Sequence, residues 1–433
     1  MNHDPRKLTY DIISEFEKNN GKLKLTRDQI INKADISNND KFRITVCTNE
    51  VVKWRKKIDF YISINLKKSI NKLDKRILNV LRIGYYEILF DAKIPIYASV
   101  DYWVQFTKIR FGRLKAGFCN AVLRKARKVK IDSNKNLKNL SIFFSYPEWL
   151  VQKWKNQFGI KKTVKLLKYF NLPPSYFIRI PKNKKINSSL EIYKNLKIEN
   201  KESNFFRIKS GLRVILENDF FKKNNCSIQD RASGAVVEIL NPKPGSMVLD
   251  VCAAPGTKAN YISDYLNGEG EIHASDIDPI RMKMGVSRSE CLSLNVNWSN
   301  KNATKDFFLK SDYIIVDAPC SGTGVLGKKL DIRWRRKKSD IKLFASLQLK
   351  ILKNISKYLK NDGILVYATC SMENEENWDV VSQFLKFDNS FSIDSPVGLI
   401  PNEWINDKNC MQTIPYKHKV DGMFAARLVK NET

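Results

Sequence analysis

The sequence predicts three domains: a helical N-terminal domain, a small α+β module and a C-terminal α/β domain with a doubly wound parallel sheet. Residues 5–128 carry helix-forming patterns and contain no proline between Pro5 and Pro95. A polar stretch over residues 130–140, rich in Asn and Lys, is typical of a linker. From about residue 230 strand and helix patterns alternate, which favours a parallel sheet covered by helices. We place the domains at residues 1–132, 141–224 and 225–433.

Apolar spacing in the N-terminal domain predicts a helix over residues 73–89. Gly84 lies inside this helix, where glycine costs about 1 kcal/mol relative to alanine. A glycine at such a place indicates a close helix contact. The apolar residues recur near the 3.6-residue helical period: Leu73, Ile77, Val80, Leu81, Ile88 and Leu89.

Basic and apolar residues interleave between Phe111 and Lys130. The plainest interpretation is an amphipathic helix with a solvated basic face. The alternative is a contact with an RNA backbone. The basic residues are Arg113, Lys115, Arg124, Lys125, Arg127, Lys128 and Lys130.

The small module is expected to begin with a helix and to contain two strands. Ser145 and Pro147 precede an apolar stretch and predict a capped helix start with proline near its first position. Runs of β-forming residues predict strands at Tyr176–Ile180 and Leu212–Leu216.

In the C-terminal domain, short apolar runs predict strands, and the segments between them predict helices. Continuous apolar runs are typical of strands buried on both faces of a parallel sheet. The loops after the carboxyl ends of such strands form the ligand crevice. The strands are expected at Met247–Val251, Glu271–Ala274, Tyr313–Val316 and Ile364–Tyr367. The helices are expected at Lys258–Leu266, Pro279–Leu292, Asp340–Leu359 and Glu373–Leu385.

The net charge of +31 favours a polyanionic partner, most simply a nucleic acid. Biased genome composition, with lysine filling the solvated surface, is the alternative interpretation.

No run approaches the roughly 18 apolar residues of a membrane-spanning helix, and no amphipathic anchor stands out. The eight cysteines form no Cys-x-x-Cys pair and the chain has three histidines, which argues against a disulfide scaffold and a zinc site. The polar first residues lack a secretory signal, so we expect a protein of the reducing cytoplasm.

A turn of small residues follows the first predicted strand of the C-terminal domain. The turn, Cys252-Ala253-Ala254-Pro255-Gly256-Thr257-Lys258, lets a ligand approach the backbone and the next helix. It matches neither a Walker pattern nor Gly-x-Gly-x-x-Gly, so it does not predict a phosphate cradle. Asp276 ends the next strand, where a carboxylate can accept hydrogen bonds from a ribose diol. The two elements together favour a nucleoside cofactor without phosphate, although a strand-end Asp is often only a helix cap, as Asp278 could be.

Cys320 and Cys370 each follow a predicted strand, so both thiols are expected at the crevice. A thiolate that adds to carbon 6 of cytosine makes the ring enamine-like, and carbon 5 can then attack an electrophilic methyl group. The carbon 5 proton must then leave and the thiol must be eliminated, so one cysteine can begin the sequence and a second can help to end it. Asp317 is placed to hydrogen-bond the polar edge of the pyrimidine. Small buried side chains are expected at the remaining cysteines Cys47, Cys119, Cys226, Cys291 and Cys410.

Several segments resemble the signature motifs of the RNA cytosine-C5 methyltransferases. They are residues 250–256 (Asp-Val-Cys-Ala-Ala-Pro-Gly), 317–324 (Asp-Ala-Pro-Cys-Ser-Gly-Thr-Gly), 367–371 (Tyr-Ala-Thr-Cys-Ser), 421–424 (Asp-Gly-Met-Phe) and the lead-in 229–233 (Gln-Asp-Arg-Ala-Ser). Residues 82–89 and 120–124 resemble the NusB-like helical RNA-binding domain. This domain pairing is similar to the RsmB (Sun/Fmu) type, which methylates 16S ribosomal RNA.

The resemblance implies a Rossmann-like class I methyltransferase domain that uses S-adenosyl-L-methionine, with no metal. Cys370 would be the nucleophile and Cys320 would aid product release, with Asp317 and Lys258 completing the catalytic group. DNA cytosine methyltransferases instead use the Pro-Cys cysteine as nucleophile, and the additional Thr369-Cys370 favours RNA. Cofactor contacts would fall on Cys252, Ala253, Ala254, Pro255, Gly256, Thr257, Lys258, Asp276, Asn302 and Asp317.

Three positions depart from the family pattern. Thr257 stands where a second Gly is common, and Pro181 replaces an Asn that usually follows the first strand of the small module. Asn302 stands where an acid is usual after the third strand, which puts one cofactor contact in question. Asp306 lies too far along the chain to be assigned that contact from sequence.

We therefore expect a monomeric enzyme that methylates carbon 5 of one cytosine in 16S rRNA. The same chemistry on tRNA or another RNA is one alternative, and methylation of purified rRNA and tRNA in vitro separates the two. A non-catalytic RNA-binding ribosome assembly factor is another alternative, favoured by intact RNA binding without methyl transfer. Base contacts specify a target whereas basic residues report only backbone affinity, so the sequence does not name the nucleotide.

Overall fold

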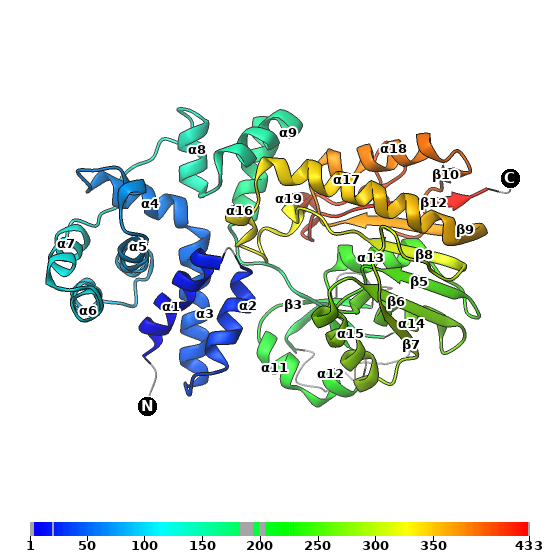
Figure 1. Ribbon diagram of the computed structural model, residues 1–433, viewed down its shortest axis with the longest axis horizontal. Coiled ribbons are helices and arrows are strands. Elements are labelled where there is room, and N and C mark those ends of the chain that lie inside the picture. Colours follow the sequence, from blue (N-terminus) through cyan, green and yellow to red (C-terminus); the bar gives the residue numbers. More distant parts are fainter. Residues whose placement is uncertain (1–3, 20, 182–193, 199–203, 225, 432–433) are drawn as a thin grey trace. The chain divides into compact units, whose positions relative to one another are not determined.

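The computed structural model in Figure 1 describes residues 4–19, 21–181, 194–198, 204–224 and 226–431. The chain divides into two compact units. The first contains the residues up to Leu172 together with Leu326–Lys337, and the second contains Pro173–Val325 and the residues from Lys338 onward. The domain limits expected from the sequence, 1–132, 141–224 and 225–433, do not coincide with these units and stay predictions.

The first unit is helical, as predicted for the N-terminal region. The longest of these helices, α9, is interrupted at Gly159, whose φ of 75° lies outside the helical region. The helices of the unit are α1 (Pro5–Asn19), α2 (Leu23–Ile31), α3 (Asn38–Lys53), α4 (Arg55–Ile64), α5 (Lys75–Phe90), α6 (Ile96–Phe111), α7 (Arg113–Leu123), α8 (Leu137–Phe144), α9 (Glu148–Tyr169) and the short α16 (Ile332–Arg335).

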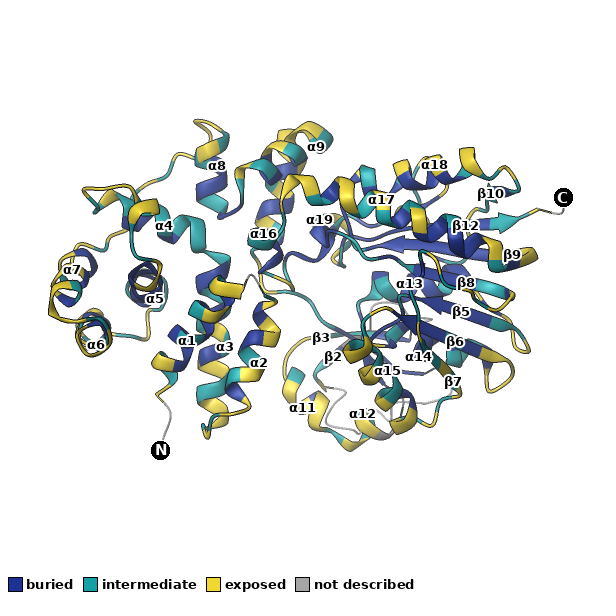
Figure 2. Ribbon diagram, viewed as in Figure 1, coloured by how far each residue is buried: buried dark blue, intermediate teal, exposed yellow. Residues whose placement is uncertain are grey.

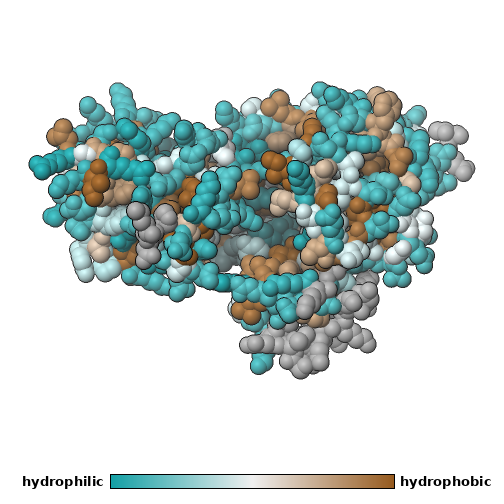
Figure 3. All heavy atoms as spheres, turned by 60° about the horizontal axis from the view of Figure 1, so that its bottom comes forward, coloured by the Kyte–Doolittle hydropathy of each residue, from teal (hydrophilic) through white to brown (hydrophobic). Residues whose placement is uncertain are grey.

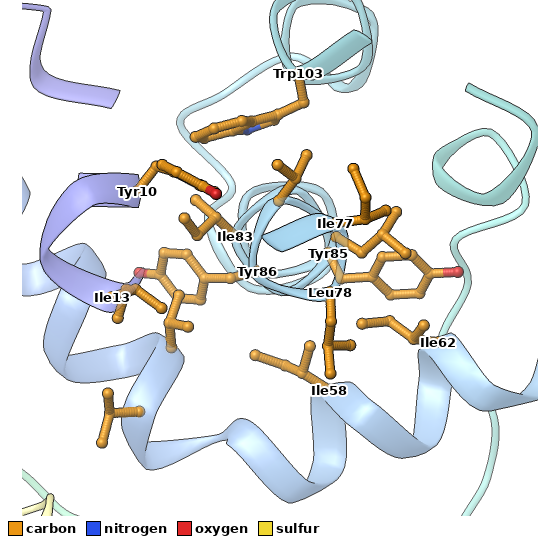
Figure 4. Packing of buried hydrophobic residues seen from close by; sticks show 14 of the residues in the cluster. Tyr10, Ile13, Ile58, Ile62, Ile77, Leu78, Ile83, Tyr85, Tyr86 and Trp103 are labelled. Carbon is orange, nitrogen blue, oxygen red and sulfur yellow. The ribbon is translucent and has the colours of Figure 1, made fainter. Parts of the chain in front are cut away.

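Helix α5 lies at the centre of the N-terminal helices and explains the periodic pattern of residues 73–89. Every residue from Ile77 to Glu87 is buried, so the helix is covered on all sides rather than on one face. The close contact predicted at Gly84 is present, because a Cβ there would lie 2.6 Å from Leu123 Cδ2. Figure 4 shows this packing around α5, with the labelled side chains Tyr10, Ile13, Ile58, Ile62, Ile77, Leu78, Ile83, Tyr85, Tyr86 and Trp103.

Two buried charged side chains of α5, Arg82 and Glu87, are hydrogen-bonded to neighbouring helices. Arg82 donates two hydrogen bonds to the carboxylate of Asp59, at 2.7 and 2.8 Å. Glu87 accepts from the hydroxyl of Ser99 at 2.7 Å and from the indole N–H of Trp103 at 3.0 Å. Because an unpaired buried charge is strongly destabilising, these partners hold the neighbouring helices in register.

The basic stretch between Phe111 and Lys130 is helical only as far as Leu123, where α7 ends. Lys115 is half-buried and donates to Asp74 at 2.8 Å. Leu114 is 93% exposed, so the solvated face of α7 is not purely polar. Residues 111–130 are therefore not a single amphipathic helix with a purely basic solvated face. The other basic residues of the stretch are exposed: Arg113, Arg124, Lys125, Arg127, Lys128 and Lys130.

The second unit begins with a small antiparallel sheet in the order β2-β3-β1-β4. The strand predicted at Tyr176–Ile180 is confirmed as β1. The strand predicted at Leu212–Leu216 is wrong, because these residues belong to helix α11. The bounds are Phe177–Arg179 for β1, Leu196–Ile198 for β2, Phe205–Ile208 for β3, Ser227–Ile228 for β4, Leu212–Glu217 for α11 and Asp219–Lys223 for α12.

Local geometry explains why residues 212–216 are helical. Gly211 takes a left-handed conformation with a φ of 66° before the helix, and the N–H of Ile215 donates to its carbonyl at 3.0 Å. Only Ile215 of the helix is buried, whereas Val214 is 52% exposed. The β-forming residues that suggested a strand therefore pack too little to override the helical turn.

The helix start predicted around Ser145 also needs correction. Helix α9 begins at Glu148 with Pro147 at its N-cap, and Ser145 instead ends α8 in a left-handed conformation. Residues 130–140 were expected to form a linker. The end of this stretch is instead helical, because α8 begins at Leu137.

The large sheet has the order β10-β12-β9-β8-β5-β6-β7, with β11 paired to β12. Strands β9, β8, β5, β6 and β7 are parallel, which confirms the doubly wound prediction. Strands β12, β10 and β11 pair antiparallel, so the complete sheet is mixed. The bounds are Met247–Val251 for β5, Glu271–Asp276 for β6, Val296–Asn300 for β7, Ser311–Asp317 for β8, Leu359–Thr369 for β9, Phe391–Ile393 for β10, Met411–Gln412 for β11 and Phe424–Lys430 for β12.

Helices cover both faces of this sheet, whose central strands are mostly buried (Figure 2). Val248 of β5 packs in the cluster that includes α13 and α14. Its neighbours Leu249 and Val251 pack in the opposite cluster, which includes α17 and α18. Alternate residues of β5 thus serve the two faces. The helices are α13 (Arg231–Leu240), α14 (Thr257–Leu266), α15 (Pro279–Cys291), α17 (Lys338–Ile355), α18 (Trp378–Phe387) and α19 (Pro415–His418).

Candidate active site

The predicted site residues lie at one edge of the large sheet, where its parallel strands end. Cys252 follows β5, and Asp276 is the last residue of β6. Asp317 is the last residue of β8, and Cys370 follows β9. Because β6, β5, β8 and β9 are adjacent in that order, these residues share the carboxyl edge of the sheet.

The two predicted catalytic thiols are in contact. Sγ of Cys320 lies 3.2 Å from Sγ of Cys370, and both side chains are half-buried. The hydrogen bond with Cys370 and burial together raise the pKa of the Cys320 thiol well above its usual value. Cys320 therefore holds its proton while Cys370 lies beside it. Two sulfurs this close can act on a single bound molecule.

Lys258 forms an ion pair with Asp317 and is within electrostatic reach of Cys370. Its Nζ donates to Oδ2 of Asp317 at 2.6 Å, and the lysine is buried near the start of α14. Burial opposes the charged form of the lysine, but the hydrogen bond and charge of Asp317 and the negative charges of Asp250 and ionised Cys370 outweigh it and raise the pKa of Lys258. Lys258 is thus a buried cation beside the nucleophile predicted from the sequence.

Asp250 is a buried carboxyl group to which the sequence analysis assigned no role. It lies in β5 with no exposed surface, and burial raises its pKa to about 8, with the charges of Asp317 and Asp276 adding to the rise. The Ala259 amide faces it without forming a hydrogen bond of ordinary geometry. A carboxyl side chain inside an otherwise apolar strand is the sequence signal that could have identified it.

The loop after β5 is a tight turn of small residues held against β6. Gly256 has a φ of 91°, and a Cβ there would lie 3.0 Å from Trp298 Cζ2. The amide of Ala253 donates to the carbonyl of Ser275 at 2.8 Å. No side chain larger than a proline ring stands between Cys252 and Thr257, so a ligand can approach this backbone closely.

Asp276 holds this loop in place. Its Oδ2 accepts from the amide of Ala254 at 3.1 Å, and its Oδ1 accepts from the amide of Asp278 at 2.9 Å. Asp278 in turn caps α15 through the amides of Ile280 and Arg281, as the sequence analysis allowed. The ribose contact expected at Asp276 stays a prediction beside this structural role.

Asn302 uses its side chain within a local turn after β7. Its Oδ1 accepts from the amide and hydroxyl of Thr304, at 3.0 and 2.7 Å. Its own amide donates to Oδ2 of Asp306 at 2.7 Å. Asn302 and Asp306 are therefore adjacent in space, and the cofactor contact expected at Asn302 stays a prediction.

Glu376 is a second group that the sequence analysis missed. It is buried in the short 3₁₀ turn Asn374–Glu376, in a segment where a regular helix was predicted. Its carboxylate accepts from the backbone amide of Ser321 at 2.7 Å and from the hydroxyl of Ser371 at 2.6 Å. These serines directly follow the two cysteines, so Glu376 links both thiol-bearing loops.

The cysteines outside the site behave mainly as expected. Cys119, Cys226 and Cys410 are buried, and Cys47 is half-buried. Cys291 is exposed, so the expectation of a buried side chain is wrong there, because it ends α15 at the surface.

A cavity of about 500 Å³ lies at the opposite edge of the large sheet. Its lining includes Gly270 before β6 and Asn295 before β7, at the amino ends of these strands. It is therefore separate from the thiol pair. Among the residues that the structure describes, no helix is long and apolar enough to cross a membrane, and no cluster of three or more potential metal ligands is found.

The C-terminal region has the features of a methyltransferase domain. It combines a Rossmann-like mixed sheet, a small-residue loop after β5 and reactive side chains at the carboxyl edge of the sheet. Two family models match the chain: "16S rRNA methyltransferase RsmB/F" over residues 237–429 and "NusB family" over residues 3–128.

Known proteins are similar over nearly the same length. A ribosomal RNA small subunit methyltransferase B from Photorhabdus laumondii is 31% identical, covering 82% of this chain and 83% of its own. A probable ribosomal RNA small subunit methyltransferase B from Bacillus subtilis is 27% identical, covering 98% of each chain. The crystal structure of PH0851 has a TM-score of 0.81 and 23% identity, covering 99% of this chain and all of that one. The chain belongs to the RsmB/F family of rRNA methyltransferases, with a NusB-like helical N-terminal domain.

Proposed function

We propose that this protein transfers a methyl group from S-adenosyl-L-methionine to carbon 5 of a cytosine in 16S rRNA. The observation that carries the proposal is the contact between Cys320 and Cys370, 3.2 Å apart beside the buried cation of Lys258. A single cysteine at this edge would be equally consistent with a small packed side chain. A thiol pair next to an ammonium group fits a reaction that both forms and breaks a sulfur–carbon bond.

In the proposed mechanism Cys370 is the nucleophile. Its thiolate would add to carbon 6 and the ring electrons would shift toward carbon 5. Carbon 5 would then take the methyl group that the bound cofactor supplies, with the electron pair of the broken sulfur–methyl bond staying on the cofactor sulfur. The positive charge of Lys258 favours the thiolate form of Cys370. The target base has to leave its stack, because a thiol cannot reach carbon 6 inside a helix.

Cys320 ends the reaction in this mechanism. Its pKa is raised first of all by the hydrogen bond with Cys370. That cause disappears once the sulfur of Cys370 is bonded to carbon 6, because a thioether sulfur carries no negative charge to hold the proton of Cys320. Cys320 then ionises more readily and its thiolate can take the carbon 5 proton, after which the carbon 6–sulfur bond breaks and returns the electron pair to Cys370.

Asp317 and Lys258 would orient the base and balance its charge. Asp317 keeps a third of its side chain exposed while it accepts from Lys258. A carboxylate with free surface at this place can accept a hydrogen bond from the polar edge of a pyrimidine, and its negative charge favours the protonated form of the ring.

The loop of residues 252–258 and Asp276 would bind the cofactor, which supplies the electrophilic methyl group. The fit is supported by the small residues of the loop and by the left-handed Gly256 at the N-terminus of α14. A nucleoside without phosphate needs no phosphate cradle here. Asn302 and Asp317 are the remaining proposed contacts.

The rRNA would be held in part by basic residues. Hydrophilic side chains cover most of the face seen in Figure 3, and the exposed cations after α7 are proposed to contact the RNA backbone. The cytoplasm remains the proposed compartment, because ribosomal RNA and reduced thiols are both found there.

Bisulfite mapping of rRNA from cells with and without this protein tests the proposal directly. One cytosine of 16S rRNA should lose its protection when the gene is deleted, and the wild-type protein should restore it whereas Cys370→Ala should not. Protection lost only in tRNA would favour the same chemistry on that substrate. Unchanged protection everywhere, with RNA binding intact, would favour a non-catalytic assembly factor.

A further inference from the structure

A single buried carboxylate connects the two loops that carry the thiols. Oε1 of Glu376 accepts from the backbone amide of Ser321 at 2.7 Å. Oε2 accepts from the hydroxyl of Ser371 at 2.6 Å and also from the hydroxyl of Ser321. Each serine is bonded to one of the cysteines, so the carboxylate spans the gap between the loops within one residue of each sulfur.

Neighbouring side chains extend this connection. Gln348 of α17 donates to the carbonyl of Pro319 at 2.9 Å and to Oε1 of Glu376 at 3.2 Å. Asn377 accepts from the hydroxyl of Thr369 at 2.6 Å and donates to the carbonyl of Ser371 at 3.0 Å. The residues before and after each cysteine are therefore held by Glu376, its neighbour Asn377 and Gln348 of α17.

We propose that Glu376 is a positioning residue that sets the separation of the Cys320 and Cys370 sulfurs. The two backbone segments are joined directly by hydrogen bonds from the amide of Gly324 to the carbonyl of Cys370 at 3.0 Å and from the amide of Ala318 to the carbonyl of Ala368 at 2.9 Å. Side chains add further links: the hydroxyls of Ser321 and Ser371 lie 3.1 Å apart, and Thr323 accepts from the amide of Met372 at 2.9 Å. Glu376 accepts from both serines beside the sulfurs, so it also fixes their hydroxyls.

The consequence for the reaction rests on the function proposed above. If one sulfur bonds to carbon 6 and the other removes the proton from carbon 5 of the same base, the distance between the two sulfurs decides whether both steps occur. A displacement of about 1 Å at a reacting group can cost on the order of 10²-fold in rate. Glu376 touches no reacting atom in this scheme and acts through the backbone of its two serines.

Three substitutions separate positioning from other roles. Glu376→Ala removes the connection and leaves the amide of Ser321 without its acceptor. Glu376→Asp keeps the charge but shortens the reach, so it can serve only one loop. Glu376→Gln keeps the shape, because its amide group can donate to the serine hydroxyls, which can rotate to accept. Glu375→Gln, at the half-buried neighbouring position, is the matched control.

Phenylarsine oxide measures thiol separation without RNA or cofactor. The arsenic bonds to two sulfurs while the two thiol protons leave with the oxide oxygen as water, so tight binding requires two thiols held close together. Titration followed by intact mass should show one bound group in the wild type, and none at this affinity in Cys320→Ala. We expect ~10-fold weaker binding in Glu376→Ala and Glu376→Asp, and wild-type binding in Glu376→Gln and Glu375→Gln.

Methyl transfer supplies the second measurement. Glu376→Ala and Glu376→Asp should lower kcat by ~10 to 100-fold with the KM for rRNA changed less than about twofold, and Glu376→Gln should recover most of the rate. Circular dichroism identifies a variant that does not fold. If Glu376→Ala fails to fold, Glu376→Asp and Glu376→Gln still decide the question.

The two measurements distinguish the failure of this inference from the failure of the proposed function. Wild-type arsenical binding in folded Glu376→Ala and Glu376→Asp would overturn the positioning role, as would a change confined to KM. A wild-type protein that transfers no methyl group, but whose arsenical affinity still falls in these variants, would overturn the proposed function and leave the positioning role standing.

Discussion

Replacing Asp250 by Asn should change how the stability of the second unit depends on pH. Burial raises the pKa of this carboxyl from 3.8 to about 8. The unfolded chain releases the proton near pH 4, whereas the folded protein keeps it up to about pH 8. The group therefore has no effect on stability below about pH 4 and opposes folding increasingly between the two values.

The size of the effect follows from the shift. Each pH unit in this window costs about 1.4 kcal/mol of unfolding free energy, because Asp250 has no exposed surface and solvent screening is small. Asp250→Asn lacks the titrating group. Between about pH 5.5 and about pH 7.5, the stability of Asp250→Asn relative to the wild type should therefore rise by about 3 kcal/mol.

Urea unfolding at several pH values, followed by circular dichroism, measures this difference. A constant offset caused by the amide itself does not matter, because the prediction concerns the slope. Asp407→Asn is the matched control, because the side chain of Asp407 is 81% exposed and lies in the same unit. Parallel curves for Asp250→Asn and the wild type would show that the carboxyl of Asp250 titrates at its ordinary pKa, and the account of this site would be wrong.

The other predictions concern the thiols, the buried cation and one close backbone contact. Cys370→Ala should abolish methyl transfer to rRNA, and a fully active variant would exclude it as the nucleophile. Cys320→Ala should leave a covalent RNA–protein complex that survives denaturing electrophoresis, and normal RNA release would exclude its role in elimination. Lys258→Met should lower the rate of methyl transfer by about 10²- to 10³-fold in single-turnover assays, since it removes a preorganised charge; a change below tenfold would contradict this role. Gly324→Ala should destabilise the protein by about 1–3 kcal/mol in urea, because its Cβ would lie 1.9 Å from the carbonyl oxygen of Gly422, and an unchanged midpoint would contradict that contact.

Much of the fold near the site follows from local patterns in the sequence. The apolar runs at β5, β8 and β9 identify three of the central strands, because strands buried on both faces need continuous apolar residues. The polar edge strand β7 and the C-terminal strands β10, β11 and β12 were not predicted. Their place depends on pairing partners distant in the sequence, as for β12, which adds antiparallel to β9.

The helix at residues 212–217 shows the same limit in the opposite direction. Its β-forming side chains favoured a strand, but the left-handed Gly211 starts a helical turn and most of the apolar residues stay partly exposed. Propensity describes what a residue does on average, and burial against a partner decides the individual case.

The sequence by itself determined that two cysteines, a small-residue loop and two strand-end carboxylates meet at one edge, because the carboxyl ends of parallel strands always share an edge. Only the tertiary structure decided that the sulfurs touch, that Lys258 is shared between Asp317 and the thiol side, and that Glu376 joins the two cysteine loops. It also decided that Asp250 is buried deeply enough to change its pKa. Contact distances and the loss of solvent depend on how separate segments pack, and no pattern within one segment contains that information.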